Sequence, residues 1–102
     1  MRIDVVGRQI EITDAIREYA EKKCEKLTRF FDQIQQITVT VESTEHKSGR
    51  EFDVEFLVDV EHHPSFVARA EDGDLYAGID RAQEKAVRQL TDFKEKLKTG
   101  NR

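Results

Sequence analysis

Hydrophobic and polar residues alternate in four stretches of the chain, which predicts four β-strands at residues 2–7, 36–47, 51–61 and 66–71. The third stretch has the clearest alternation, so one face of the sheet is expected to pack in the core and the other to be acidic and exposed to solvent. Its apolar positions are Phe52, Val54, Phe56, Val58 and Val60, and its acidic positions are Asp53, Glu55, Asp59 and Glu61.

Two longer segments carry apolar residues at every third or fourth position, which predicts two amphipathic helices. The first covers residues 14–34, and Thr13 is its expected N-cap. The second begins after Asp72 or Asp74 and is expected to end at Gly100. The apolar stripe of the second helix comprises Leu75, Ile79, Ala82, Ala86, Leu90, Phe93 and Leu97.

The order of these elements is strand, helix, three strands, helix. The first two strands are joined through a helix, so they are expected to be parallel, whereas the later strands are joined by turns and are expected to be antiparallel. Both helices must then cover the one apolar face of the sheet. The sequence therefore predicts an α+β two-layer sandwich, β-α-β-β-β-α, with a four-stranded mixed sheet and one domain over residues 1–102.

The overall charge argues against nucleic acid as a partner, because the formal net charge is -4 and phosphate binding needs cations. That objection holds only for an even distribution of charge. The acids are concentrated in the strands between Glu42 and Asp74, whereas Arg81, Lys85 and Arg88 follow one side of the second helix. A basic helix face and an acidic sheet face are predicted, although a charged helix side is also typical of a merely solvated surface.

The distribution of charge determines which surface could meet RNA. A sheet that binds single-stranded RNA presents aromatic side chains outward, whereas the outward residues here are carboxylates, which repel phosphate. Any RNA partner must therefore contact the helices through phosphate and shape contacts, as it does in a double-stranded RNA binder.

Four short motifs resemble one family. Residues 11–17 read EITDAIR, residues 26–27 read KL, residues 74–79 read DLYAGI, and residues 85–90 read KAVRQL. In order and at this spacing they resemble the short form of the bacterial ribosome hibernation-promoting factors, which include the ribosome-associated inhibitor A protein. The resemblance spans nearly the whole chain.

The resemblance implies a fold similar to double-stranded RNA-binding domains and a cytoplasmic role in stressed or stationary-phase cells. It implies binding to the small ribosomal subunit and its ribosomal RNA near the decoding centre, which blocks messenger and transfer RNA and inhibits translation. Short members of this kind promote ribosome pairing together with a separate ribosome modulation factor, whereas the inhibitor type keeps ribosomes single. The chain stops soon after the second helix, which favours the pairing type.

The expected RNA-binding residues lie on both helices. The family's basic positions fall on Arg17, Lys23 and Lys26 in the first helix and on Lys85, Arg88 and Asp92 in the second, and the charge pattern adds Lys22 and Arg81. The chain departs from the family's pattern at two positions. Asp92 stands where lysine is expected, and Gly78 stands where alanine is usual, which would fit a close approach of the helix to the sheet or to RNA.

Other chemistry has little support in the sequence. His62, His63 and Pro64 lie in an expected turn without further metal ligands nearby, and Cys24 fits a small buried residue rather than a nucleophile. Tyr76 fits the core at the start of the second helix, with an RNA contact as the alternative. No enzyme activity, metal, cofactor, small-molecule substrate or membrane partner is therefore expected.

Two alternatives to a ribosome factor remain from the residues themselves. One is a protein-interaction module that uses the acidic sheet face without RNA. The other is a binder of free double-stranded RNA.

Overall fold

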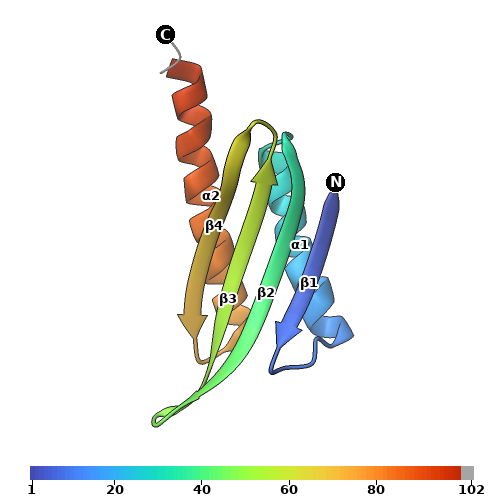
Figure 1. Ribbon diagram of the computed structural model, residues 1–102, viewed down its shortest axis with the longest axis vertical. Coiled ribbons are helices and arrows are strands. Elements are labelled where there is room, and N and C mark those ends of the chain that lie inside the picture. The colour runs from blue at the N-terminus through green and yellow to red at the C-terminus, as the bar shows by residue number, and fades with distance from the viewer. Residues whose placement is uncertain (100–102) are drawn as a thin grey trace.

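The computed structural model describes residues 1–99 and confirms the predicted order of elements (Figure 1). The elements are β1 (Arg2–Arg8), α1 (Asp14–Phe30), β2 (Ile34–His46), β3 (Gly49–Val60), β4 (His63–Asp72) and α2 (Leu75–Thr99). The expected end of the second helix at Gly100 lies outside the described residues.

The four strands form one mixed sheet in the order β1-β2-β3-β4. Strand β1 is parallel to β2, with Val5 opposite Val39. The pairs β2–β3 and β3–β4 are antiparallel, as the short connections predict. Strands β1 and β4 are therefore the two edges of the sheet.

Both helices lie on one face of the sheet, so the protein has two layers (Figure 1). The alternating apolar residues of β2 and β3 point toward these helices: Val39 and Phe56 are fully buried, and Val54 is 1% exposed. The helices contribute the other half of the core, mainly Ile16, Ala20, Cys24, Leu27, Ile79, Ala82, Ala86 and Leu90. The inward-facing positions predicted for β3 are confirmed, although Phe52 is only partly buried, and the predicted burial of Cys24 is confirmed as well.

Helix α1 begins where the sequence predicts and ends earlier. The side-chain oxygen of Thr13 accepts a hydrogen bond from the backbone N–H of Ile16 at 3.2 Å, which confirms Thr13 as the N-cap. The helix ends at Phe30 because Phe31 takes an extended conformation, with φ -144° and ψ 109°. Ile34, expected at the end of the helix, is instead the first residue of β2 and pairs with Val60. Its apolar side chain fits the helical period by coincidence and is buried as a strand residue.

The turn between β3 and β4 is shorter than predicted. It consists of Glu61 and His62, with His62 at φ 61°, and His63 and Pro64 already belong to β4. Proline is tolerated there because β4 is an edge strand and need not donate on its outer side. His63 joins the sheet, and its ring stacks on that of Phe66 at a centroid distance of 4.6 Å.

Two glycines mark close approaches of the backbone. A Cβ atom on Gly7 would lie 2.4 Å from the carbonyl oxygen of Ile10, so the chain can fold back after β1 only without a side chain there. A Cβ atom on Gly78 would lie 3.1 Å from a methyl group of Val54. Gly78 therefore allows the first turn of α2 to lie close to β3, which agrees with the helix-to-sheet approach expected from the sequence.

Candidate nucleic-acid interface

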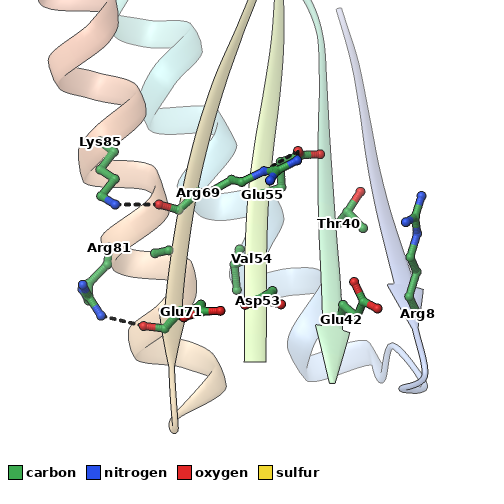
Figure 2. Close-up of a pocket in the computed structure, with 11 residues that line it drawn as sticks. Arg8, Thr40, Glu42, Asp53, Val54, Glu55, Arg69, Glu71, Arg81 and Lys85 are labelled. Atoms are coloured by element: carbon green, nitrogen blue, oxygen red, sulfur yellow. Dashed lines mark hydrogen bonds and ion pairs between the residues drawn. The ribbon is translucent and has the colours of Figure 1, made fainter. Parts of the chain in front are cut away.

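Helix α2 directs a row of polar side chains onto the outer edge of β4, and this row includes two of the predicted RNA-binding residues. Arg81 donates to the carbonyl oxygen of Glu71 at 2.7 Å, and Lys85 donates to that of Arg69 at 2.7 Å (Figure 2). One turn later, Gln89 donates to the carbonyl oxygen of Val67 at 2.9 Å. These three donors are called the edge cover below.

The edge cover forms because the spacing of every fourth residue along α2 matches the spacing of every second residue along β4. Four residues of a helix rise about 6 Å, and two residues of a strand rise about 6.7 Å. Helix α2 follows β4 after a short turn and runs back along it, so every fourth helix residue meets every second strand residue. Donors at Arg81, Lys85 and Gln89 therefore fall in register with alternate carbonyl groups of the strand.

The predicted basic row on α2 is therefore divided between two roles. Arg81 is bound to the strand and also forms an ion pair with Asp72 at 3.3 Å, and Lys85 is bound to the strand through its ammonium group. Arg88 is exposed and has no hydrogen-bond or ion-pair partner within residues 1–99. Of the three, Arg88 is the cation of α2 that needs no rearrangement to meet a phosphate.

The basic residues of α1 also differ in availability. The ammonium group of Lys23 lies 3.1 Å from the carboxylate of Asp80, and only 22% of its side chain is exposed. Lys22 and Lys26 are exposed and have no ion-pair partner in the described part of the chain. Arg17 is equally free, but it lies five residues before Lys22 and nine before Lys26, which puts it about half a turn around the helix from them. The structure therefore does not bring Arg17 onto the surface formed by Lys22 and Lys26.

Asp80, near the N-terminal end of α2, joins the two helices. It accepts a hydrogen bond from the hydroxyl of Tyr19 at 2.7 Å in addition to its ion pair with Lys23. Partial burial raises the pKa of Asp80, but the hydrogen bonds from Tyr19 and Lys23 outweigh this and hold the pKa below its ordinary value. The same hydrogen bond raises the pKa of Tyr19 to about 12. The prediction that Tyr76 belongs to the core is wrong, because its side chain packs edge-on against Tyr19 and is 37% exposed.

The pair Tyr19–Asp80 predicts a loss of stability at alkaline pH. A tyrosine with a raised pKa holds its proton in the folded state, so its stabilising effect is complete below pH 10 and disappears as the pH rises toward 12. We expect Tyr19→Phe to lower the free energy of unfolding by about 1 kcal/mol at neutral pH, and to flatten the decline between pH 10 and 12. Urea unfolding measured across this pH range tests the prediction, and an unchanged decline in Tyr19→Phe would contradict it. The variant Tyr76→Phe, which removes the neighbouring hydroxyl, is the matched control.

Lys94 does not compensate for the acid at Asp92. Its ammonium group donates to the carbonyl oxygen of Phe30 at 3.0 Å, at the C-terminal end of α1, where a cation also offsets the helix dipole. Asp92 itself is exposed on α2. A negative charge therefore remains on the helix layer within the predicted basic row.

The outer face of the sheet is acidic, as predicted, and carries no aromatic side chain on β3. Cross-strand pairing places Glu42, Asp53 and Glu71 side by side on three strands, with Arg8 at the β1 end of the row (Figure 2). A hydrogen bond with Asp53 and the charge of that residue raise the pKa of Glu71. Carboxylates next to one another would repel phosphate, so this face is unsuited to RNA.

Other types of site have no counterpart in residues 1–99. No group of three or more His, Cys, Asp or Glu side chains in this range is arranged to hold a metal ion. Neither of its two helices has the length and apolar composition needed to cross a bilayer.

Gln89 is the residue of this surface that the sequence analysis missed. It has no charge, and the predicted row was built from charge alone. The signal that could have found it is the spacing Arg81, Lys85, Gln89, which places three long donors on one side of a helix that follows directly after an edge strand.

Known proteins are similar to this chain in both sequence and structure. The family described as "Sigma 54 modulation protein / S30EA ribosomal protein" matches residues 3–98. The ribosome hibernation promoting factor of Escherichia coli is 40% identical over 100 residues, which cover 96% of this chain and 98% of that protein. A ribosomal subunit interface protein from Coxiella burnetii has a similar structure, with a TM-score of 0.80 and 27% identity over 93% of this chain and 99% of that one. The N-terminal domain of Thermus thermophilus Protein Y has a TM-score of 0.76 and 36% identity, over 91% of this chain and 99% of that one.

Proposed function

Because the chain belongs to the Sigma 54 modulation protein / S30EA ribosomal protein family, we propose that it is a ribosome hibernation factor whose helix layer binds the small ribosomal subunit. Its partner there is ribosomal RNA near the decoding centre. The bound protein occupies the path of messenger and transfer RNA and so inhibits translation in stressed or stationary-phase cells, in the cytoplasm. The mechanism is steric exclusion, and no catalysis is involved.

The observation that carries this proposal is the division of charge between the two layers. Arg88, Lys22 and Lys26 are exposed on the helices without a hydrogen-bond or ion-pair partner in the described chain, whereas a row of carboxylates without interspersed cations lies on the opposite face of the sheet. Phosphate contacts made by such cations give affinity and orientation without reading a base sequence. The acidic face then points away from the RNA.

The seven candidate residues contribute unequally in this proposal. Arg88, Lys22 and Lys26 contact phosphate directly. Arg81, Lys85 and Lys23 must first exchange an internal partner for a phosphate, which lowers what each adds to the affinity. Arg17 contacts a different part of the RNA, because it lies about half a turn from Lys22 on the same helix.

Gradient sedimentation of purified ribosomes with the protein tests the proposal. Co-migration with small subunits and with whole ribosomes is expected, and none with isolated large subunits. The same gradient shows whether ribosomes remain single or pair, with and without a ribosome modulation factor, and we expect pairing when that factor is present. Absence of the protein from every fraction that contains small subunits would refute the proposal.

The acidic row Glu42–Asp53–Glu71 supports a second candidate function, a module that binds a protein through the sheet face. The dependence of binding affinity on salt concentration distinguishes the two candidate functions. Counterion release makes RNA affinity fall steeply as salt increases, in proportion to the number of phosphates contacted, whereas a protein held by the three carboxylates of this row is expected to lose less affinity over the same range of salt. Binding to plain duplex RNA without ribosomes would instead indicate a free double-stranded RNA binder.

The acid on α2 gives a prediction for affinity. Replacing Asp92 by lysine removes a repulsion and adds a cation, which we expect to strengthen ribosome binding about fivefold, or about 1 kcal/mol. The matched control is Glu42→Lys, which makes the same change of charge on the outer face of the sheet and is expected to change affinity less than about twofold because of screening. Equal gains in the two variants, measured by titration of labelled protein with small subunits, would contradict binding through the helices.

A further inference from the structure

The edge cover points to a second interaction surface, which goes beyond the proposed function. An edge strand has main-chain groups that can pair with another strand, and proteins cover such edges to prevent association. We propose that the outer edge of β4 is a self-pairing edge that joins β4 of a second copy of this chain once Arg81, Lys85 and Gln89 are withdrawn from it.

The acceptors that a new strand would use are those that the edge cover occupies. Within an antiparallel sheet, alternate residues point both main-chain groups to the same side. The carbonyl groups of Val67, Arg69 and Glu71 accept from α2, so these residues face away from β3. Each of the three outward carbonyls therefore already has a donor, and none of these donors comes from a strand.

Within the described chain, the edge cover leaves one polar atom of Gln89 without a hydrogen bond. Its amide nitrogen donates to Val67, while its own oxygen Oε1 is buried and has no hydrogen-bond partner within residues 1–99. An unsatisfied buried acceptor is unfavourable, because it loses its hydrogen bonds to water without replacing them. The side chain is thus positioned for what it donates to the strand.

The sequence of β4 selects a second copy of itself as the occupant. A two-fold axis at Ala70 places Arg69 of each copy directly opposite Glu71 of the other, in an antiparallel pair. Opposite charges at such positions stabilise a strand pair. Ala70 on the axis is small and faces the core, so it does not obstruct the approach.

Glu71 would gain most from this arrangement. Within one copy it is the cross-strand neighbour of Asp53, a like charge, whereas Arg69 is already 2.9 Å from Glu55 (Figure 2). In the paired form Glu71 acquires an arginine directly opposite. The charge pattern of β4 is therefore better satisfied by two copies than by one.

The edge cover also opposes pairing through its charge. Both helices lie on the same face of the sheet, so extending the sheet across β4 would bring the two α2 helices together with Arg81 and Lys85 of each copy near the axis. Their repulsion adds to the loss of the edge-cover hydrogen bonds. The intact protein is therefore expected to be monomeric.

Removing the edge cover tests the proposal. We expect the variant Arg81→Ala, Lys85→Ala, Gln89→Ala to form a dimer in sedimentation equilibrium, with a dissociation constant at least tenfold below that of the unaltered chain. The matched control Arg88→Ala, Lys22→Ala, Gln35→Ala loses the same residue types from exposed positions elsewhere and is expected to stay monomeric. If the first variant does not fold, as judged by circular dichroism, Arg81→Met with Lys85→Met keeps the apolar stems and tests the same edge.

The register is tested separately by exchanging charges in the variant that lacks the edge cover. Adding Glu71→Arg places two arginines opposite each other and is expected to abolish the dimer, while its new contact with Asp53 favours the fold. Adding Arg69→Glu as well restores opposite charges and is expected to restore the dimer. A folded variant that stays monomeric without the edge cover, or a dimer unaffected by Glu71→Arg, overturns the proposal. Neither result depends on ribosome binding.

Discussion

The double charge reversal Arg88→Glu with Lys26→Glu is expected to weaken binding to the small ribosomal subunit by a factor of about 100. Each reversal removes a phosphate contact and adds a repulsion, which together amount to about 1.4 kcal/mol per residue at a partly screened site. Both residues are exposed and form no hydrogen bond or ion pair within the described chain, and Lys26 acts on Asp80 only through its charge, so the fold should be unchanged. Co-sedimentation with purified small subunits at several salt concentrations measures the loss. The slope of log affinity against log salt concentration should become shallower by the amount that about two phosphate contacts contribute.

The control for this prediction is Arg2→Glu with Arg8→Glu, which changes the net charge equally on the exposed side of β1, opposite to the side on which Val5 is buried beneath the helices. Salt screens charges at such distances, so we expect a change in affinity below about threefold. An equal loss in both double variants would show that net charge, and not the helix surface, controls binding. Lys85→Glu is a poorer choice, because it also breaks the bond to Arg69 and opens the edge of β4.

Much of the fold follows from the spacing of apolar residues. The alternation in β3 has one structural solution, since Val54, Phe56 and Val58 can be buried together only on one face of a strand. Boundaries were less predictable. Ile34 satisfies the helical period and the strand period equally, and only its pairing with Val60 decides between them. Likewise, Pro64 signals a turn in the sequence but is accepted in a strand because β4 lies at an edge.

The candidate surface was predictable in composition but not in detail. Helical spacing predicts correctly that Arg81, Lys85 and Arg88 share one side of α2. It does not by itself show that an edge strand lies beside that side, so charge and spacing on the helix alone did not predict the internal partners of Arg81 and Lys85. The ion pair of Lys23 with Asp80 has the same origin, because it joins residues of two different helices that only the tertiary structure brings together.

The second large effect is on stability, and it concerns the packing of α1 against the core. Leu27 is fully buried and is the largest such side chain of that helix, since the fully buried residues with it are Ala20 and Cys24. We expect Leu27→Ala to lower the free energy of unfolding by about 3 kcal/mol, the usual result of leaving a cavity in a core. Urea denaturation followed by circular dichroism measures this as a lower midpoint with an unchanged slope.

Leu27→Ala is also expected to affect the proposed function, because it disturbs the position of α1. Lys22 and Lys26 lie on the helix that Leu27 attaches to the core, so a loosened helix presents both cations less precisely to RNA. We therefore expect weaker binding to small subunits even at temperatures where the variant is folded. The control Leu97→Ala removes the same atoms from a side chain that is 47% exposed, and its effect on stability should stay within about 0.5 kcal/mol. Equal denaturation midpoints for the two variants would show that α1 is not anchored by Leu27.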